Sequence, residues 1–135
     1  MTNPQPQPQR EPSTDSSTLP SEAVQAAEAY FLPSGSGSRH EIFPGVVLRA
    51  IAGPNLMLSV VHLEPGSIVQ DHSHPHEQMG ILLEGRVEFT IGGITRLLNP
   101  GDMWRIPGGV VHRVKTLDQP SVAIDVFHPV REDYR

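Results

Sequence analysis

Residues 66–85 read GSIVQDHSHPHEQMGILLEG and residues 101–116 read GDMWRIPGGVVHRVKT, and these two stretches carry the strongest signals in the chain. The first contains His72, His74 and Gln78, and His112 of the second follows Gln78 by 34 residues. Imidazole nitrogens and an amide oxygen are neutral ligands that suit a divalent first-row metal ion. The pattern therefore predicts a metal site in which the ion keeps its full charge and has positions open for an anionic ligand.

The spacing of the histidine pair agrees with this interpretation. Alternate residues of an extended strand face the same side, so His72 and His74 can point into one cavity. Histidine-rich runs also occur as tags, flexible metal scavengers or solvated loops, and Pro75 interrupts the segment. The pair by itself leaves these alternatives open.

The two stretches resemble the paired motifs of the cupin superfamily, G-x5-H-x-H-x3-4-E-x6-G and G-x5-P-x-G-x2-H-x3-N. Their order matches, and 15 residues, 86–100, separate them. Gln78 stands where cupins usually carry glutamate, and Thr116 stands where the second motif usually ends in asparagine. The resemblance implies a metal held in the mouth of a double-stranded β-helix, and the neutral amide favours Lewis-acid over redox chemistry.

The organisation of the chain agrees with an all-β fold, a single-domain jelly-roll barrel over residues 39–135, where short apolar runs alternate with turn residues. Residues 1–38, rich in Pro, Gln, Ser and Thr at the start, are expected to form a disordered tail with a possible short helix at 21–32. The expected strands are 46–51, 56–63, 68–72, 78–83, 86–91, 95–98, 102–106, 112–115 and 122–127.

A third group of candidate residues lies at the C-terminal end. Asp125 and Phe127 share a face by strand alternation, and Arg131 follows Pro129 closely enough to reach the same opening. An inward Asp125 would need a partner, since burying an unpaired carboxylate is costly. The alternative is a surface ion pair between Asp125 and Arg131.

The D-x-F-x-P-x-R-x-D ending, taken with the two histidine motifs, is similar to that of the pectin-degradation cupins that linearise 4,5-unsaturated monouronates. This resemblance implies metal binding by His72, His74, Gln78 and His112. It also implies that Asp125 and Arg131 are catalytic and that Phe127 and Arg131 bind the substrate, a small anionic sugar. The product would be an open-chain 5-keto-4-deoxyuronate. A metal-dependent cupin dioxygenase and a non-catalytic protein that binds sugars or small anions stay open as alternatives.

Composition adds further expectations. The formal net charge of −5 argues against general nucleic-acid binding, and no apolar run has the roughly 18 residues of a membrane span. Without cysteine, thiolate metal sites are excluded and nothing implies secretion, so we expect a cytoplasmic protein. The ion would be one divalent transition metal, either nickel, zinc, iron, manganese or copper.

Strand parity gives an expectation about assembly. If Gln78 faces the barrel interior, Met79, Ile81 and Leu83 face outward, and an inward Asp125 likewise turns Ile124 outward. A row of large apolar side chains is unfavourable in water. We therefore expect a homodimer that buries this face, with the N-terminal helix as an alternative cover.

Overall fold

The computed structural model describes residues 2, 4, 21–22 and 30–135. The chain divides into two units, Met1–Pro33 and Ser34–Arg135. Ser21, Glu22 and Tyr30 have helical backbone, and the remaining residues of the expected helix before Tyr30 lie outside the described residues, as does most of the expected tail. The second unit contains the strands and the candidate site.

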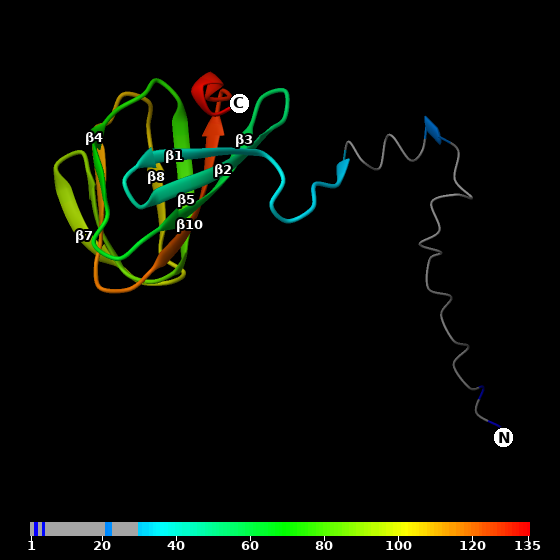
Figure 1. The fold of residues 1–135 in the computed structure, drawn as a ribbon, viewed down its shortest axis with the longest axis horizontal. Helices are drawn as coiled ribbons and strands as arrows, with labels where there is room; N and C mark the ends of the chain where they lie inside the picture. Colours follow the sequence, from blue (N-terminus) through cyan, green and yellow to red (C-terminus); the bar gives the residue numbers. More distant parts are fainter. Residues whose placement is uncertain (1, 3, 5–20, 23–29) are drawn as a thin grey trace. The chain divides into compact units, whose positions relative to one another are not determined.

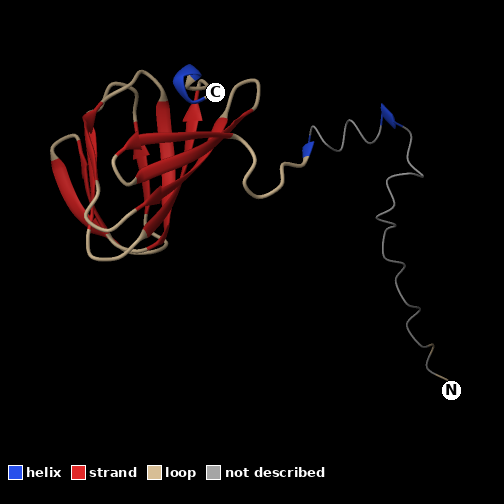
Figure 2. Cartoon of the chain, viewed as in Figure 1, coloured by secondary structure: helices blue, strands red, loops and turns tan. Residues whose placement is uncertain are grey.

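The second unit consists of two antiparallel sheets that face each other (Figure 1). Its secondary structure is almost entirely strand (Figure 2). The six-stranded sheet has the order β1-β2-β3-β10-β5-β8, and the four-stranded sheet has the order β4-β9-β6-β7. The strands are β1 Ser38–Phe43, β2 Val46–Ala52, β3 Met57–Leu63, β4 Ile68–His72, β5 Glu77–Glu84, β6 Val87–Ile91, β7 Ile94–Leu98, β8 Met103–Ile106, β9 His112–Thr116 and β10 Ser121–His128.

The predicted all-β barrel is confirmed, and each of the nine expected strands is present with small shifts at its ends. Two elements differ from the expectation. Residues 38–43 form β1, which pairs with β2, although the first strand expected from the sequence began at residue 46. A 3-10 helix, η2, spans Glu132–Tyr134 at one end of the barrel (Figure 1).

The core lies between the two sheets and follows the alternation of the strands. In β10, residues 121, 123, 125 and 127 are buried while 122, 124 and 126 are partly exposed. In β5, Gln78 and Leu82 are buried, whereas Met79 and Leu83 are exposed. The inward and outward faces predicted from parity are therefore confirmed.

Thr116, which stands where the cupin motif usually has asparagine, makes hydrogen bonds that join β9 to the turn before β4. Its Oγ1 accepts a hydrogen bond from the backbone N–H of Ser67 at 2.8 Å and donates to the carbonyl oxygen of Glu64 at 2.8 Å. The hydrogen bonds of Thr116 thus hold together β4 and β9, the strand pair that carries His72 and His112.

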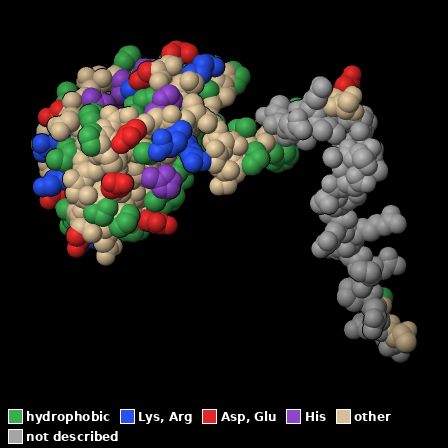
Figure 3. Space-filling model, viewed as in Figure 1, with side chains coloured by type: hydrophobic (Ala, Val, Ile, Leu, Met, Phe, Trp, Pro, Cys, Tyr) green, Lys and Arg blue, Asp and Glu red, His purple; other side chains and the backbone are tan. Residues whose placement is uncertain are grey.

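The visible surface of the folded unit has acidic and basic side chains interspersed with apolar ones (Figure 3). Several of the exposed apolar side chains belong to the six-stranded sheet, including Leu58, Met79 and Met103, which are 40%, 51% and 74% exposed. An outer sheet face of this kind is unusual for a surface that stays in contact with water.

Candidate metal centre and the surrounding cavity

A cavity opens between the two sheets, and its lining combines apolar and polar side chains. The apolar part of the lining includes Leu48, Val61, Val87 and Phe89. The polar side chains that line the cavity are His72, Gln78, Trp104, His112, Asp125, Arg131 and Tyr134. The candidate site is therefore a cluster of polar groups in a cavity that is otherwise lined by apolar side chains.

Three histidines meet in this cluster. His72 ends β4 and His112 begins β9, and the two residues pair in register. His74 lies in the loop after β4, where its carbonyl oxygen accepts a hydrogen bond of 2.8 Å from the backbone N–H of Gly109. One ring nitrogen from each histidine lies within 4.8 Å of the corresponding atoms of the other two. The two sequence motifs thus converge as the resemblance implies.

The glycines of the second motif allow this convergence. A Cβ at Gly108 would collide with the backbone of Pro75, and Gly109 has φ +84°, which side chains with a Cβ rarely adopt. The loop before β9 can therefore lie directly against the loop that carries His74.

The backbone fixes the tautomer of all three rings. His72 Nδ1 lies 2.8 Å from the carbonyl oxygen of Gln70, His74 Nδ1 lies 3.0 Å from that of His76, and His112 Nδ1 lies 2.9 Å from that of Val110. A carbonyl oxygen can only accept, so each neutral ring carries its hydrogen on Nδ1 and a lone pair on Nε2. This arrangement is the usual one for metal-binding histidines.

Burial keeps these lone pairs available. Burial lowers the pKa of His112 from 6.5 to about 4, against the opposing effect of its hydrogen bond to Val110. Burial, followed by the charge of Arg131, also lowers the pKa of His74. The buried Nε2 of His112 has no hydrogen-bond partner among the described residues. An unpartnered buried lone pair beside two others fits a metal ion, so the three-histidine group can hold one.

Gln78 connects the histidines with the opposite wall of the cavity. Its Oε1 lies 3.0 Å from His74 Nε2, and its Nε2 donates to Asp125 Oδ1 at 2.9 Å. With the hydrogen of His74 on Nδ1, both the imidazole nitrogen and the amide oxygen present lone pairs to each other. A cation between them would remove this repulsion, which places the amide oxygen among the possible ligands.

Asp125 is buried on β10 and accepts two hydrogen bonds on one oxygen. Besides Gln78, the indole Nε1–H of Trp104 donates to Oδ1 at 2.8 Å. Burial raises the pKa of Asp125, while these two hydrogen bonds and then the charge of Arg131 act against the rise. The alternative of a surface pair is wrong, because Asp125 is only 8% exposed and Arg131 pairs with Asp133 at 3.1 Å.

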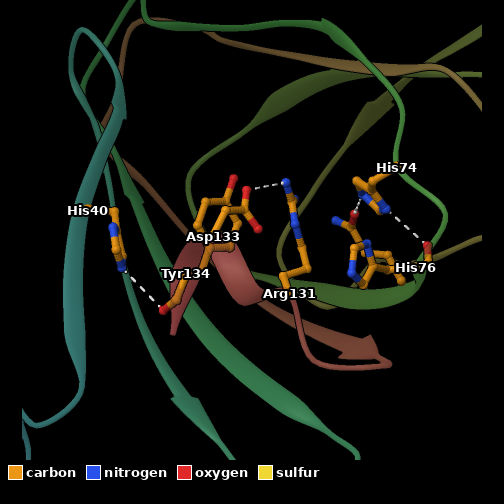
Figure 4. A network of polar contacts seen from close by, with 7 residues as sticks. His40, His74, His76, Arg131, Asp133 and Tyr134 are labelled. Carbon is orange, nitrogen blue, oxygen red and sulfur yellow. Dashed lines mark hydrogen bonds and ion pairs between the residues drawn. The ribbon is translucent and has the colours of Figure 1, made fainter.

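Arg131 lies between aromatic rings at the mouth of the cavity. Its Cζ lies 4.1 Å from the ring centroid of Tyr134 and 5.2 Å from that of Phe127, a geometry in which cation–π attraction operates. Its buried Nε has no hydrogen-bond partner among the described residues. Figure 4 shows Arg131 between Asp133 and Tyr134 on one side and His74 on the other. An N–H donor that lacks a partner inside a cavity suits an anionic group.

The C-terminal helix is attached to β1. The carbonyl oxygen of Tyr134 accepts a hydrogen bond from the hydroxyl of Ser38 and lies 3.2 Å from His40 Nε2 (Figure 4). The ring of Tyr134 lines the cavity, and burial raises the pKa of its hydroxyl. This role of Tyr134 could not be predicted from the sequence, because it depends on contacts between the two ends of the folded unit.

Three further histidines and Trp104 lie outside the set that was predicted to bind the metal or the substrate. The ring of His76 packs edge-on against the ring of His74, with ring centroids 5.5 Å apart, and its carbonyl oxygen lies 3.0 Å from His74 Nδ1. His62 and His128 are exposed. Trp104 packs on Phe89 with ring centroids 5.0 Å apart, and its hydrogen bond to Asp125 was not predicted from the sequence. Only the paired alignment of β10, β5 and β8 reveals it.

Comparison with known proteins places this geometry in a family. The Cupin domain model matches residues 59–127, which include all three histidines, Gln78 and Asp125. The chain therefore belongs to the cupin family.

Two relatives narrow the resemblance. The chain is 36% identical over 96 residues to the pectin degradation protein KdgF of Dickeya dadantii, across 70% of this chain and 87% of that protein. The structure of KdgF from Halomonas sp. superimposes with a TM-score of 0.66 and 30% identity, across 74% of this chain and 98% of the other. The chain thus resembles KdgF in both sequence and fold.

A relative with a different name matches a smaller share of the chain. The dimethylsulfoniopropionate lyase DddQ of Ruegeria pomeroyi is 35% identical over 74 residues, which cover 54% of this chain and 37% of that protein.

The part of the chain that the structure describes contains no helix of the length and apolarity that crossing a membrane requires. The cytoplasmic location stays a prediction.

Proposed function

We propose that this cupin is a metal-dependent enzyme that converts 4,5-unsaturated monouronates into open-chain 5-keto-4-deoxyuronates. The observation that carries the proposal is that one cavity contains both a group of possible metal ligands and residues that can transfer a proton and bind an anion. Three histidine lone pairs converge on one side, and a buried carboxyl group and an arginine lie on the other. The resemblance to KdgF supports the substrate class, since the name of that protein assigns it to pectin degradation.

The metal ligands in this proposal are the Nε2 atoms of His72, His74 and His112 and the Oε1 atom of Gln78. All four donors are neutral, and the three rings are held by backbone carbonyl groups. A divalent ion bound there supplies Lewis acidity and can activate water. Because nitrogen-rich sites accept several first-row ions, the proposal covers nickel, zinc, iron, manganese and copper.

The remaining polar residues act on the sugar. The guanidinium of Arg131 binds the carboxylate of the uronate, for which its unpartnered Nε–H is available. Phe127, whose ring is buried beside His74, forms an apolar wall against the sugar ring. Asp125 carries the proton, since its Oδ2 receives none of the hydrogen bonds that the described residues make to this carboxyl group.

The reaction balances without an oxidant or reductant. A proton adds to C4 of the cyclic enol ether and the oxygen of water adds to C5. The bond between C5 and the ring oxygen then breaks, its electron pair returns to that oxygen, and the C5 hydroxyl loses its proton to give the ketone. C1 is left with two hydroxyl groups and loses water to become an aldehyde. The product is therefore an isomer of the substrate.

The decisive experiment follows the absorbance of the conjugated double bond during incubation of purified protein with an unsaturated monouronate. Separate reactions use sugars prepared from pectin and from alginate, and a reaction without protein gives the uncatalysed rate. We expect loss of absorbance well above that rate, loss of activity with a chelator, and recovery on addition of a divalent metal. An unchanged rate with the metal-loaded protein would reject the proposal.

Two further measurements separate the alternatives. Oxygen consumption in the same reaction would identify a dioxygenase, which the neutral Gln78 disfavours. Binding of the sugar in a calorimeter with no change in absorbance would identify a non-catalytic binding protein. The protein named DddQ supplies a third comparison, so dimethylsulfoniopropionate is included as a substrate.

We also propose that the protein forms a homodimer through the outer face of the six-stranded sheet. Apolar side chains continue across this face from strand to strand, because Leu58 pairs with Val126 and Val126 pairs with Met79. A neighbouring row joins Val60, Ile124 and Ile81. A second copy of the same face would bury both rows.

Sedimentation equilibrium tests this assembly. Deletion of residues 1–33 leaves all ten strands in place, and we expect the truncated protein to remain a dimer. Met79→Lys, which places a charge in the middle of the face, should shift the equilibrium towards monomer. A truncated protein that stays monomeric at high concentration would reject the homodimer.

A further inference from the structure

We propose that Trp104 is a positioning residue for Asp125. Its indole N–H and the amide of Gln78 hold the same carboxyl oxygen, so that Oδ2 is the oxygen turned towards a bound ligand. The effect on catalysis rests on the proposed function, whereas the hydrogen bond itself can be tested without it.

The arrangement depends on three adjacent strands. In register, Asp125 of β10 pairs with Gly80 of β5, and Gly80 pairs with Trp104 of β8. Two strand spacings, about 10 Å, therefore separate the backbones of Asp125 and Trp104. The long indole spans this distance, since Nε1 lies 2.8 Å from Asp125 Oδ1.

This contact is possible because Gly80, which lies between the two residues, has no side chain. A Cβ at this position would collide with both Oδ1 of Asp125 and Nε1 of Trp104. Gly80 has no positive φ that would require glycine for backbone reasons. The absence of a side chain is therefore explained by the hydrogen bond that passes over it.

The choice of tryptophan has a chemical reason beyond packing. A phenylalanine would also pack on Phe89, but the indole Nε1–H is a donor that cannot act as an acceptor. It must therefore meet Asp125 as a donor, just as the amide of Gln78 does. Both donors reach Oδ1, which sets the rotation of the carboxyl group about its bond to Cβ.

The same contact has a consequence for the metal side of the cavity. Because Asp125 Oδ1 accepts from Gln78 Nε2, the amide oxygen of Gln78 must point the other way, towards His74. Trp104 thus acts on two groups through one hydrogen bond. It orients the carboxyl group directly and supports the orientation of the amide through that carboxyl group.

The first test uses the fact that the chain contains one tryptophan. Its indole N–H gives a single cross-peak in a proton–nitrogen NMR spectrum of the full-length protein. We expect this proton to exchange slowly with deuterium, and we expect Asp125→Ala to shift the peak and accelerate exchange. The remaining cross-peaks report whether the variant is folded, and Asp125→Asn provides a second variant. Fast exchange in the wild-type protein, or an unchanged peak in folded Asp125→Ala, would overturn the hydrogen bond.

The second test measures turnover of the unsaturated monouronate by Trp104→Phe. Loss of the donor should reduce kcat by roughly 10- to 100-fold, the size of effect expected from a misplaced catalytic group. KM and metal content should stay within about threefold of their wild-type values, because no ligand of the metal or sugar is removed. Ile106→Val is the matched control, since it removes a methylene from the same buried face of β8 and no donor.

A double variant separates positioning from a general loss of stability. In the Asp125→Ala background, Trp104→Phe should cause no further loss of kcat, because the group that it positions is gone. An additional loss as large as in the wild-type background would overturn the positioning role. If the wild-type protein has no activity on the sugar, the proposed function fails, while the NMR result still decides the contact between Trp104 and Asp125.

Discussion

The two walls of the cavity offer opposite kinds of polar atom. On the wall formed by the ends of β4 and β9, every imidazole N–H is bonded to the backbone and lone pairs face inward. On the wall formed by β5, β8 and β10, the inward groups are the carboxyl group of Asp125 and its donors, with Arg131 at the mouth. One wall is suited to a cation, and the other is suited to moving a proton and holding an anion.

Gln78 is the one residue of this cluster that serves both walls. Its oxygen faces His74 and its nitrogen faces Asp125, at 3.0 and 2.9 Å. A carboxylate, as cupins usually have here, could not donate to Asp125. The buried carboxyl group of Asp125 therefore explains why glutamine replaces the usual glutamate at position 78, since only the amide can donate a hydrogen bond to it.

The largest effect is expected from removing a ligand on the cation side. His112→Ala deletes the most buried of the three lone pairs and should abolish stoichiometric metal binding. Turnover of the unsaturated monouronate should fall by about 10⁴-fold or more, since the ion would supply several kcal/mol of stabilisation. Elemental analysis of the purified variant and the absorbance assay measure the two effects.

The control for His112→Ala is His62→Ala, which removes an exposed histidine from the outer face of the six-stranded sheet. It should retain metal and activity. A His112→Ala variant that binds one metal per chain as tightly as the wild type would show that the ion is held elsewhere.

Asp125→Asn tests the opposite wall. Asparagine keeps the shape and an oxygen for Trp104 but cannot carry the transferred proton, so kcat should fall by about 10²- to 10⁴-fold. Metal content should stay at the wild-type level, because the three histidines and the amide of Gln78 remain. Near-normal turnover would exclude Asp125 as the proton carrier and leave the ion as the main catalytic group.

Much of the fold and of the cation side could be predicted from the sequence. Within each motif the spacing is set by local strand and turn geometry, so His72, His74 and His112 could be found in the linear sequence. The pairing of β4 with β9 then brings the two motifs together. The strand β1 was missed because SRHEIF alternates only weakly between polar and apolar residues. Its place is fixed by pairing with β2, which is information that a single segment does not contain.

The proton side was harder to predict for a topological reason. Asp125, Gly80 and Trp104 form one row only because β5 lies between β10 and β8. Parity alone could place Asp125 inside the barrel, but it could not reveal which donors meet it. Tyr134 was missed in the same way, because its position depends on contacts with Ser38 and His40 at the other end of the folded unit.

Gln78→Glu replaces the amide that contacts both walls with a second acid. The variant loses the donor to Asp125 and sets two carboxyl groups against each other, which should lower the free energy of unfolding of the metal-free protein by about 1–3 kcal/mol. Saturating divalent metal should recover part of this loss, because the new carboxylate is itself a ligand. Chemical denaturation with and without metal measures both effects.

The matched control for this variant is Gln70→Glu, which introduces the same charge at an exposed position of β4. It should leave the free energy of unfolding within about 0.5 kcal/mol of the wild-type value. Equal destabilisation by the two substitutions would mean that net charge, and not the contact with Asp125, determines the residue at position 78.

The smallest effect is expected at the mouth, where Tyr134 supports the residue that would bind the anion. Tyr134→Leu removes the ring that lies 4.1 Å from the guanidinium carbon of Arg131. A partly buried cation–π contact contributes about 1 kcal/mol, so KM for the sugar should rise by about three- to tenfold while kcat changes little. Tyr134→Phe keeps the ring and should keep KM near the wild-type value. If Tyr134→Phe raises KM as much as Tyr134→Leu does, the hydroxyl group and not the ring is what matters, and Tyr134 would then contact the sugar itself.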